Sequence, residues 1–144
     1  MKKISVGAQG DSKAARSDVW SLVANANHYP KWGPWSEGGY EPEHPGPSQP
    51  GMHQWFKYGR TTSREQILEV REGTNVVYTV TGGIPVKNYR AVIELTDNGV
   101  GTHISWTADW DATLLGKLVH KKLQAVYTEI MECLVRTADA KVSA

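Results

Sequence analysis

The feature that most constrains this chain is the apolar pattern near its C-terminal end. Between about Leu114 and Thr137, apolar residues recur at the spacing of one helical face, and these residues are Leu115, Val119, Leu123, Val126, Ile130 and Leu134. Leu118 and Cys133 widen the stripe. A helix of this length with one apolar side needs a large apolar surface to pack against. The sequence therefore predicts a long amphipathic helix lying on another layer of structure.

Residues 52–111 supply that layer, because they read as strands separated by turns. Segments 63–71 and 75–81 form one expected hairpin, and segments 88–96 and 101–110 form a second. Asn98-Gly99 favours a two-residue turn, since both central residues of such a turn need positive φ. The predicted pairs, all on one face, are Leu95 with Thr102, Ile93 with Ile104, Ala91 with Trp106 and Tyr89 with Ala108.

The N-terminal third predicts a strand, a helix and two irregular segments. Residues 2–9 alternate weakly between apolar and polar, and residues 11–26 carry a narrow apolar stripe at helical spacing. Residues 28–38, HYPKWGPWSEG, must end that helix, at most after one short extra turn, because two prolines and two glycines exclude a continuous regular helix or strand. The four prolines of residues 41–51 predict a surface loop. A linker is excluded, since neither flank is long enough to fold alone, so we expect one domain over residues 1–144.

Composition narrows the classes of partner. The formal net charge is +1, which gives no global field to attract nucleic acid or a membrane. The densest basic cluster, formed by Lys117, Lys121 and Lys122, is interpreted as a solvated helix face rather than a phosphate site. The lone Cys133 sits in an apolar helical setting, which indicates a buried structural thiol and fits a reducing cytoplasm. No signal peptide or membrane span is expected, so a cytoplasmic chain is predicted.

Motifs of catalysis are missing from the sequence. There is no nucleophile elbow, phosphate loop or dinucleotide fingerprint, and the five histidines lack metal-ligand spacing. We therefore predict no cofactor and no metal.

Arg64 is the ionisable residue of most interest. A turn at Gly73-Thr74 would pair Val70 with Val77, Leu68 with Thr79 and Gln66 with Thr81, and would place Arg64 on the same inward face. A buried guanidinium is costly unless it is paired. The expected partner is Glu37, water or the carbonyl or carboxylate of a ligand, and a purely structural salt bridge is an equal alternative.

The aromatic residues allow two interpretations each. Trp106 lies mid-strand opposite the small Ala91, where core filling is favoured over a role in a pocket wall. Tyr89 and Trp110 lie towards strand ends, which suit side chains with an apolar body and a polar tip. Trp55 could face either way, because the register of the third strand is not fixed by the pattern.

The order of elements, together with "SDVWSLVANANHYPKW", "SREQILEV", "GTHISW" and the final helix, resembles the START-like superfamily that includes Bet v 1 and the polyketide cyclase/dehydrase-like proteins. The resemblance implies an α+β helix-grip fold. In that fold a curved antiparallel sheet of about seven strands wraps around the long C-terminal helix, with two short helices after the first strand. It also implies a cavity for a hydrophobic molecule between the sheet and the helix.

In this topology, residues 28–38, "YGRTT", "TGGIPVK" and "WDATLLG" would form the cavity mouth, and the proline-rich loop would lie at the far end. In aromatase/cyclase members, an arginine of the corresponding strand faces the pocket. Arg64 in "TSREQ" matches it and is the candidate catalytic residue. An inward tyrosine of those members has no secure match, since Gly38 is at or near the position and Tyr40 is close by. The predicted ligand-binding residues are Trp32, Trp35, Arg64, Gln66, Tyr89, Trp106 and Trp110.

The expected function is binding of a hydrophobic or amphipathic small molecule, lipid- or polyketide-like, by a monomer or homodimer. A polyketide cyclase/dehydratase acting in the same cavity is the alternative. A third interpretation is an interaction module whose exposed aromatic residues dock a protein.

Overall fold

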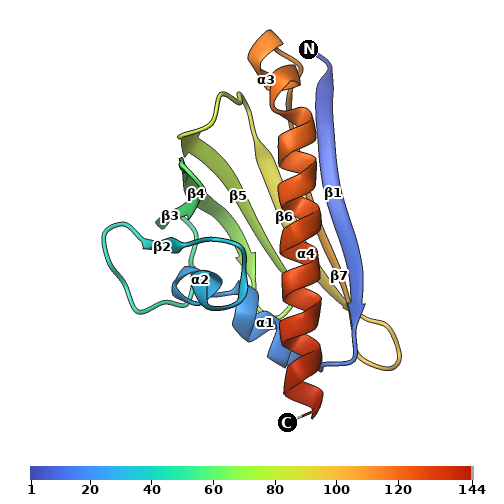
Figure 1. Cartoon of the computed structure of the whole chain (residues 1–144). Coiled ribbons are helices and arrows are strands. Elements are labelled where there is room, and N and C mark those ends of the chain that lie inside the picture. The colour runs from blue at the N-terminus through green and yellow to red at the C-terminus, as the bar shows by residue number, and fades with distance from the viewer. Residues whose placement is uncertain (144) are drawn as a thin grey trace.

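A computed structural model describes residues 1–143 and shows a curved antiparallel sheet with a long helix lying across it (Figure 1). The sheet has seven strands in the order β1-β7-β6-β5-β4-β3-β2. The strands are β1 (Lys3–Ser12), β2 (Glu37–Tyr40), β3 (His53–Tyr58), β4 (Thr61–Arg71), β5 (Asn75–Gly82), β6 (Arg90–Asp97) and β7 (Thr102–Asp111). The α+β helix-grip fold predicted from the sequence is confirmed.

Two groups of helices flank the sheet. After β1 come α1 (Arg16–Val23), a 3₁₀ turn η1 (Ala26–His28) and α2 (Tyr29–Trp32), and after β7 come α3 (Leu114–Leu118) and α4 (His120–Ser143). The first helix begins later than expected, because β1 runs on to Ser12 and Ala15 is the N-cap residue of α1. No helix within residues 1–143 is long and apolar enough to cross a membrane.

The C-terminal helix predicted from about Leu114 to Thr137 is two helices. The break falls at Val119, which is the C-cap of α3. Leu115 and Leu118 were expected on the buried stripe, but their exposed fractions are 56% and 71%, so that part of the prediction is wrong. The buried face of α4 is formed by Tyr127, Ile130, Met131, Leu134 and Ala138.

Helix α4 is fixed to the sheet through the edge strand β1. The Gln124 side chain accepts the backbone N–H of Gly7 at 3.0 Å and donates to the Gly7 carbonyl at 2.8 Å. Further along, the Ser12 hydroxyl donates to Asp139 at 2.8 Å. The two bonds to Gly7 satisfy backbone groups that an edge strand would otherwise leave open. Together with the Ser12 bond they set the position of α4 over the sheet.

The β6–β7 hairpin has the predicted faces but a different register. Leu95 lies opposite Ile104, and Ile93 lies opposite Trp106. The connection contains four residues, because the Asn98 side-chain oxygen accepts the N–H groups of Val100 and Gly101. The predicted two-residue turn is therefore wrong. Its faces survive because the shift is two residues and side chains alternate with a period of two.

The β4–β5 hairpin departs from the prediction in a way that changes the site. Gln66 lies opposite Thr79 instead of Thr81, and the register shifts between Ile67 and Glu69 and again between Arg64 and Glu65. A bulge reverses the alternation of the strand beyond it. As a result Glu65 and Ile67 are buried under the helix layer, whereas Arg64 faces outward.

The third strand has a register that the sequence left open. Gln54 and Phe56 of β3 are buried, and they lie opposite Glu65 and Ser63 of β4. Trp55 lies opposite Arg64 and therefore on the outer face. The inward row of β3 and β4 thus combines an aromatic ring, an amide and a carboxyl group.

Candidate ligand-binding site

A cavity of about 200 Å³ lies between the inner face of the sheet and α4. Its α4 wall includes Leu123, Val126 and Ile130, and its sheet wall includes Phe56 and Val80. These side chains are apolar, because the stripe of α4 and the inner row of the sheet face each other across the gap. The walls suit the hydrophobic part of a small molecule.

The mouth of the cavity is formed by connections that meet at one end of the sheet. Trp35 follows α2, Tyr58 and Thr61 flank the β3–β4 turn, and Ile84 and Pro85 belong to the β5–β6 connection. These three connections were predicted to form the mouth. The fourth, "WDATLLG", does not line it, and the following Val119 and Lys122 take its place.

Glu65 is the carboxylic acid buried at this cavity. One of its carboxylate oxygens accepts from the Gln54 amide at 2.8 Å, and the other accepts from the Ser63 hydroxyl at 3.1 Å. Its exposed fraction is only 8%. Among the described residues, no lysine, arginine or histidine forms an ion pair with it. The site therefore holds an acid supported by neutral donors alone.

Burial raises the pKa of Glu65 to about 7, against the lowering effect of its hydrogen bonds from Gln54 and Ser63. An uncompensated carboxylate is costly in an apolar setting, so the proton is retained to higher pH. Near neutrality this side chain exists in both forms. It can donate a hydrogen bond when protonated, and it can accept a proton when ionised.

Three tyrosines form a hydroxyl cluster beside Glu65. The Tyr127 hydroxyl of α4 bonds to that of Tyr89 and lies 3.4 Å from that of Tyr78. Trp106 donates its indole N–H to the Tyr78 hydroxyl at 3.0 Å. Burial raises the pKa of all three phenols, so they stay neutral hydrogen-bonding groups. All three tyrosines line the cavity.

Residues 28–38 build an aromatic wall beside the cavity. Tyr29 stacks on Phe56 at 4.8 Å and on Trp35 at 5.1 Å between ring centroids. Trp32 is buried and donates its indole N–H to the Leu22 carbonyl at 3.0 Å. A Cβ at Gly33 would overlap the ring of Trp35, so glycine is needed there. Trp32 is thus the last residue of α2, and Gly33 and Pro34 lead from that helix to the half-buried Trp35.

The structure separates the seven predicted ligand-binding residues into three groups. Trp35 and Tyr89 line the cavity, and ligand contacts through them stay a prediction. Trp32, Trp106 and Trp110 are buried in the core behind it, with Trp110 donating to the Gly116 carbonyl at 2.9 Å. For these three, core packing accounts for the position.

Arg64 and Gln66 lie away from the cavity, so the inward orientation predicted for them is wrong. The side chain of Arg64 is 55% exposed and pairs with Glu41 at 2.8 Å instead of Glu37. The Gln66 amide points to the Gly51 carbonyl at 3.4 Å. The bulge in β4 is the physical reason, because it turns the alternation by one residue.

Sequence reasoning missed Glu65, Tyr78 and Tyr127. Tyr127 had a usable signal, since it lies four residues after Leu123 and three before Ile130 on the apolar stripe of the helix. Tyr78 lies in β5, and the predicted register between β5 and β4 was wrong. Glu65 had no signal in the pattern, because a regular strand would have placed it on the solvent face.

The position of the inward tyrosine of cyclase members is filled differently here. A Cβ at Gly38 would overlap the ring of Phe56, which lies opposite Gly38 on the neighbouring strand. Tyr40 is buried, but its hydroxyl accepts the Ala26 N–H at 3.1 Å and bonds Ser48 at 2.7 Å. Tyr40 therefore fastens the proline-rich loop instead of serving the cavity.

Other hollows of the molecule are shallower. A groove of about 430 Å³ is lined by Asn27, Gly38, His44 and Trp55, and its carboxyl group, that of Glu43, is exposed. No cluster of three or more potential metal ligands exists within residues 1–143. The cavity under α4 is therefore the candidate site.

The curved sheet, the long helix across it and the cavity between them define a helix-grip protein with a pocket that opens at one end. Residues 3–139 match the model of a family described as polyketide cyclase / dehydrase and lipid transport. The chain belongs to this family. No curated protein matches the chain.

Solved structures agree with this fold. A protein from Thermobifida fusca is 22% identical, with a TM-score of 0.78 over 94% of this chain and 93% of that one. The di-domain ARO/CYC StfQ of the steffimycin pathway is 12% identical, with a TM-score of 0.76 over 99% of this chain and 52% of StfQ. The Aha1 dimer of Colwellia psychrerythraea is 14% identical, with a TM-score of 0.71 over 94% and 96%. At these identities the likeness concerns the fold.

Proposed function

We propose that this protein binds a small amphipathic molecule in the cavity under α4. The observation that carries the proposal is an apolar cavity lined by the buried Glu65 carboxyl, three buried phenols and the half-buried Ser63 hydroxyl. Such a site accepts an apolar body and orients it through one hydroxyl or carbonyl group. A family described by cyclisation, dehydration and lipid transport supports a small-molecule ligand.

The size of the cavity limits the ligand. At about 200 Å³ it is below the roughly 300–1,000 Å³ of pockets for drug-sized molecules. We infer a ligand with one or two rings, or a short chain. A fully extended polyketide would not fit without movement of α4 or of the mouth.

A cyclase or dehydratase is the second candidate, and Glu65 is the observation that favours it. In an intramolecular aldol step, its carboxylate would take a proton from the carbon between two carbonyls, and that carbon would form a bond to a third carbonyl. The protonated Glu65 would then return the proton to the new alkoxide. A phenol such as that of Tyr89 would stabilise the enolate by donating a hydrogen bond. Arg64, exposed and paired with Glu41, has no contact with a substrate held there.

A neighbouring pair of residues on β5 gives a direct test of binding. Val80 lines the cavity, whereas Thr81 is exposed on the opposite side of the same strand. Val80→Trp fills the cavity, and Thr81→Trp adds the same bulk outside it. With 2-naphthol and 2-acetonaphthone as probes in calorimetry, the wild type and Thr81→Trp should bind alike and Val80→Trp should bind at least about tenfold more weakly. Equal binding by Val80→Trp, or none by the wild type, would contradict the proposal.

A further inference from the structure

Three leucines of the short helix α3 are unusually exposed. The exposed fractions are 78% for Leu114, 56% for Leu115 and 71% for Leu118. The buried position of α3 is Gly116, whose carbonyl receives the Trp110 indole. The leucines therefore belong to no core and form an apolar patch at one end of the molecule. Patches of this kind mark surfaces that contact a partner or a membrane.

Basic residues surround this patch. Residues 1–5, 83–90 and 109–122 contain seven basic and two acidic side chains, whereas the whole chain has a formal net charge of +1. The seven basic residues are Lys2, Lys3, Lys87, Arg90, Lys117, Lys121 and Lys122. Asp111 is paired with Lys3 at 2.7 Å, and Arg90 is paired with Glu69 of β4 at 3.9 Å, so the other five basic side chains have no ion-pair partner among the described residues. The positive charge is therefore concentrated at the end that carries the leucines.

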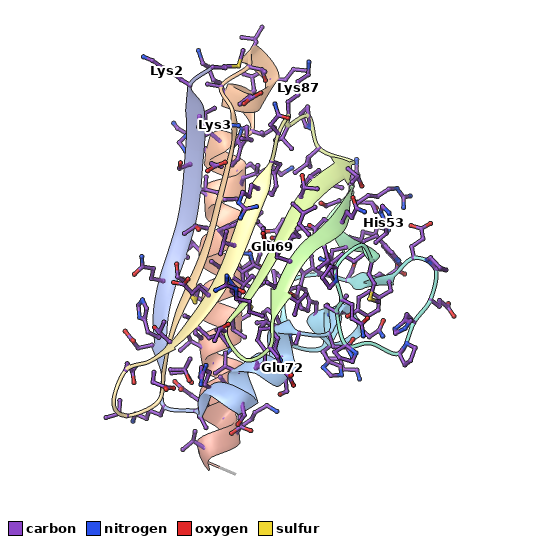
Figure 2. All side chains as sticks on the ribbon, turned by 180° about the vertical axis from the view of Figure 1, so that it is seen from behind. Lys2, Lys3, His53, Glu69, Glu72 and Lys87 are labelled. Atoms are coloured by element: carbon purple, nitrogen blue, oxygen red, sulfur yellow. The ribbon has the colours of Figure 1, made fainter. Side chains whose placement is uncertain are left out.

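The backbone holds the lysines of three separate segments beside α3. The N–H of Asp111 donates to the Lys87 carbonyl, and that of Ala112 donates to the Lys2 carbonyl, both at 2.9 Å. Figure 2 shows Lys2, Lys3 and Lys87 together at this end. Lys117 is part of α3, and Lys121 lies in the first turn of α4. We call Leu114, Leu115 and Leu118 with these lysines the leucine–lysine surface.

We propose that the leucine–lysine surface docks on a bilayer that contains anionic lipids. The leucines would enter the boundary between headgroups and acyl chains, and the lysines would lie against lipid phosphates. Charge decides between the occupants. Two copies of the surface placed face to face would bring their lysines together, and like charges oppose such a contact. An anionic bilayer offers negative headgroups to the lysines and an apolar interior to the leucines.

This inference goes beyond the proposed function, because it concerns a surface and does not depend on the cavity being filled. The two features are adjacent, however. Val119 and Lys122, which follow α3, line the cavity mouth together with Ile84 and Pro85 of the β5–β6 connection. Figure 1 shows α3 and that connection at the same end of the molecule. A docked protein would therefore have the cavity mouth beside the bilayer.

Vesicle sedimentation tests the docking. The full chain should sediment with vesicles of phosphatidylcholine and phosphatidylglycerol, and it should not sediment with phosphatidylcholine alone or at high salt. Leu114→Ser/Leu118→Ser and Lys117→Glu/Lys121→Glu should each weaken binding about tenfold or more. All four positions are exposed, so the variants should fold, which circular dichroism verifies.

Matched controls lie at other exposed positions. Val100→Ser removes an apolar side chain that is 81% exposed at the β6–β7 turn, and Lys13→Glu reverses an exposed charge. Both should bind vesicles like the wild type. The proposal is overturned if the wild type does not sediment with anionic vesicles, or if the leucine and lysine variants sediment as well as the wild type. It is also overturned if the wild type binds no vesicles but self-associates, and Leu114→Ser/Leu118→Ser abolishes that self-association. Binding of 2-naphthol by the same variants reports on the cavity separately.

Discussion

Glu65 is the residue on which the chemistry of this protein centres. Its carboxyl is buried among neutral donors, whereas the adjacent Arg64 is held outside by Glu41. One side chain that is half protonated near neutral pH can recognise both a hydroxyl and a carbonyl. The same property would serve proton transfer. The pH dependence of stability and of binding therefore reports on this single residue.

The raised pKa of Glu65 predicts a loss of stability as pH rises. The folded state holds the proton to about pH 7, and the unfolded state releases it near 4.5. The free energy of unfolding therefore falls through this window, by up to about 3 kcal/mol. Glu65→Gln removes the titrating group. The free energy of unfolding of the variant should therefore be higher than that of the wild type at about pH 8 and close to it at about pH 5.

Urea unfolding at the two pH values makes this measurement. Glu69→Gln is the matched control, because Glu69 is an exposed glutamate of the same strand (Figure 2). It should follow the pH profile of the wild type. A difference between Glu65→Gln and the wild type that does not change with pH would show that Glu65 is not the titrating group.

The tyrosine cluster predicts a second effect at a single residue. Tyr127→Phe leaves the Tyr89 and Tyr78 hydroxyls without their shared partner inside the protein. The expected cost is about 1–3 kcal/mol in the free energy of unfolding. Tyr58→Phe is the control, since that hydroxyl bonds Glu129 at the surface, and it should cost less than about 0.5 kcal/mol. Equal losses in thermal or urea unfolding would argue against a buried network.

Among the elements, α4 is joined to the edge strand β1 by side-chain hydrogen bonds, two of which go to the backbone of Gly7. Gln124→Ala removes both bonds to Gly7. We expect a loss of about 1–3 kcal/mol and faster hydrogen exchange at the Gly7 amide. Glu132→Ala changes an exposed position of the same helix and should leave both measurements unchanged. Unchanged exchange at Gly7 in Gln124→Ala would mean that β1 does not depend on the helix.

The elements also show which parts of the structure follow from sequence pattern. The stripe from Val119 to Leu134 predicted α4 and its need for a sheet, because helical periodicity depends only on local spacing. The faces of β6 and β7 followed from alternation, although the turn at Asn98 was longer than predicted. The prediction that Leu115 and Leu118 are buried was wrong, because the helix is interrupted at Val119 and α3 holds both side chains in solvent. Nothing in the spacing of the leucines marks that break.

The candidate site was less predictable than the elements. A bulge inserts one residue into a strand without any required residue type, so the reversal at β4 had no sequence signal. Because of that reversal, Glu65 faces inward in the structure, whereas the sequence predicted Arg64 in that orientation. The residues of 28–38 were placed correctly beside the cavity, yet only Trp35 lines it. Which indole faces a cavity depends on packing with Tyr29 and Phe56, which the pattern does not contain.

At the scale of the whole molecule, the sheet and α4 enclose a cavity whose mouth lies next to the leucine–lysine surface. Trp106 and Trp110 are fully buried and fill the core behind the cavity. The cavity itself is lined by aromatic and aliphatic side chains nearer the mouth. This arrangement fits a protein that takes up a small molecule at one end. Such a role needs a cavity that is occupied when the protein is isolated from cells.

Native mass spectrometry of gently purified protein, followed by organic extraction, tests this central claim most directly. The wild type and Thr81→Trp should carry the same added mass, and the extract should contain a small, mainly apolar molecule with a hydroxyl or carbonyl group. Val80→Trp should carry none, because the indole fills the space. Repeated preparations without any bound molecule and without a mass shift on adding 2-naphthol, or equal loading of Val80→Trp, would contradict binding in the cavity.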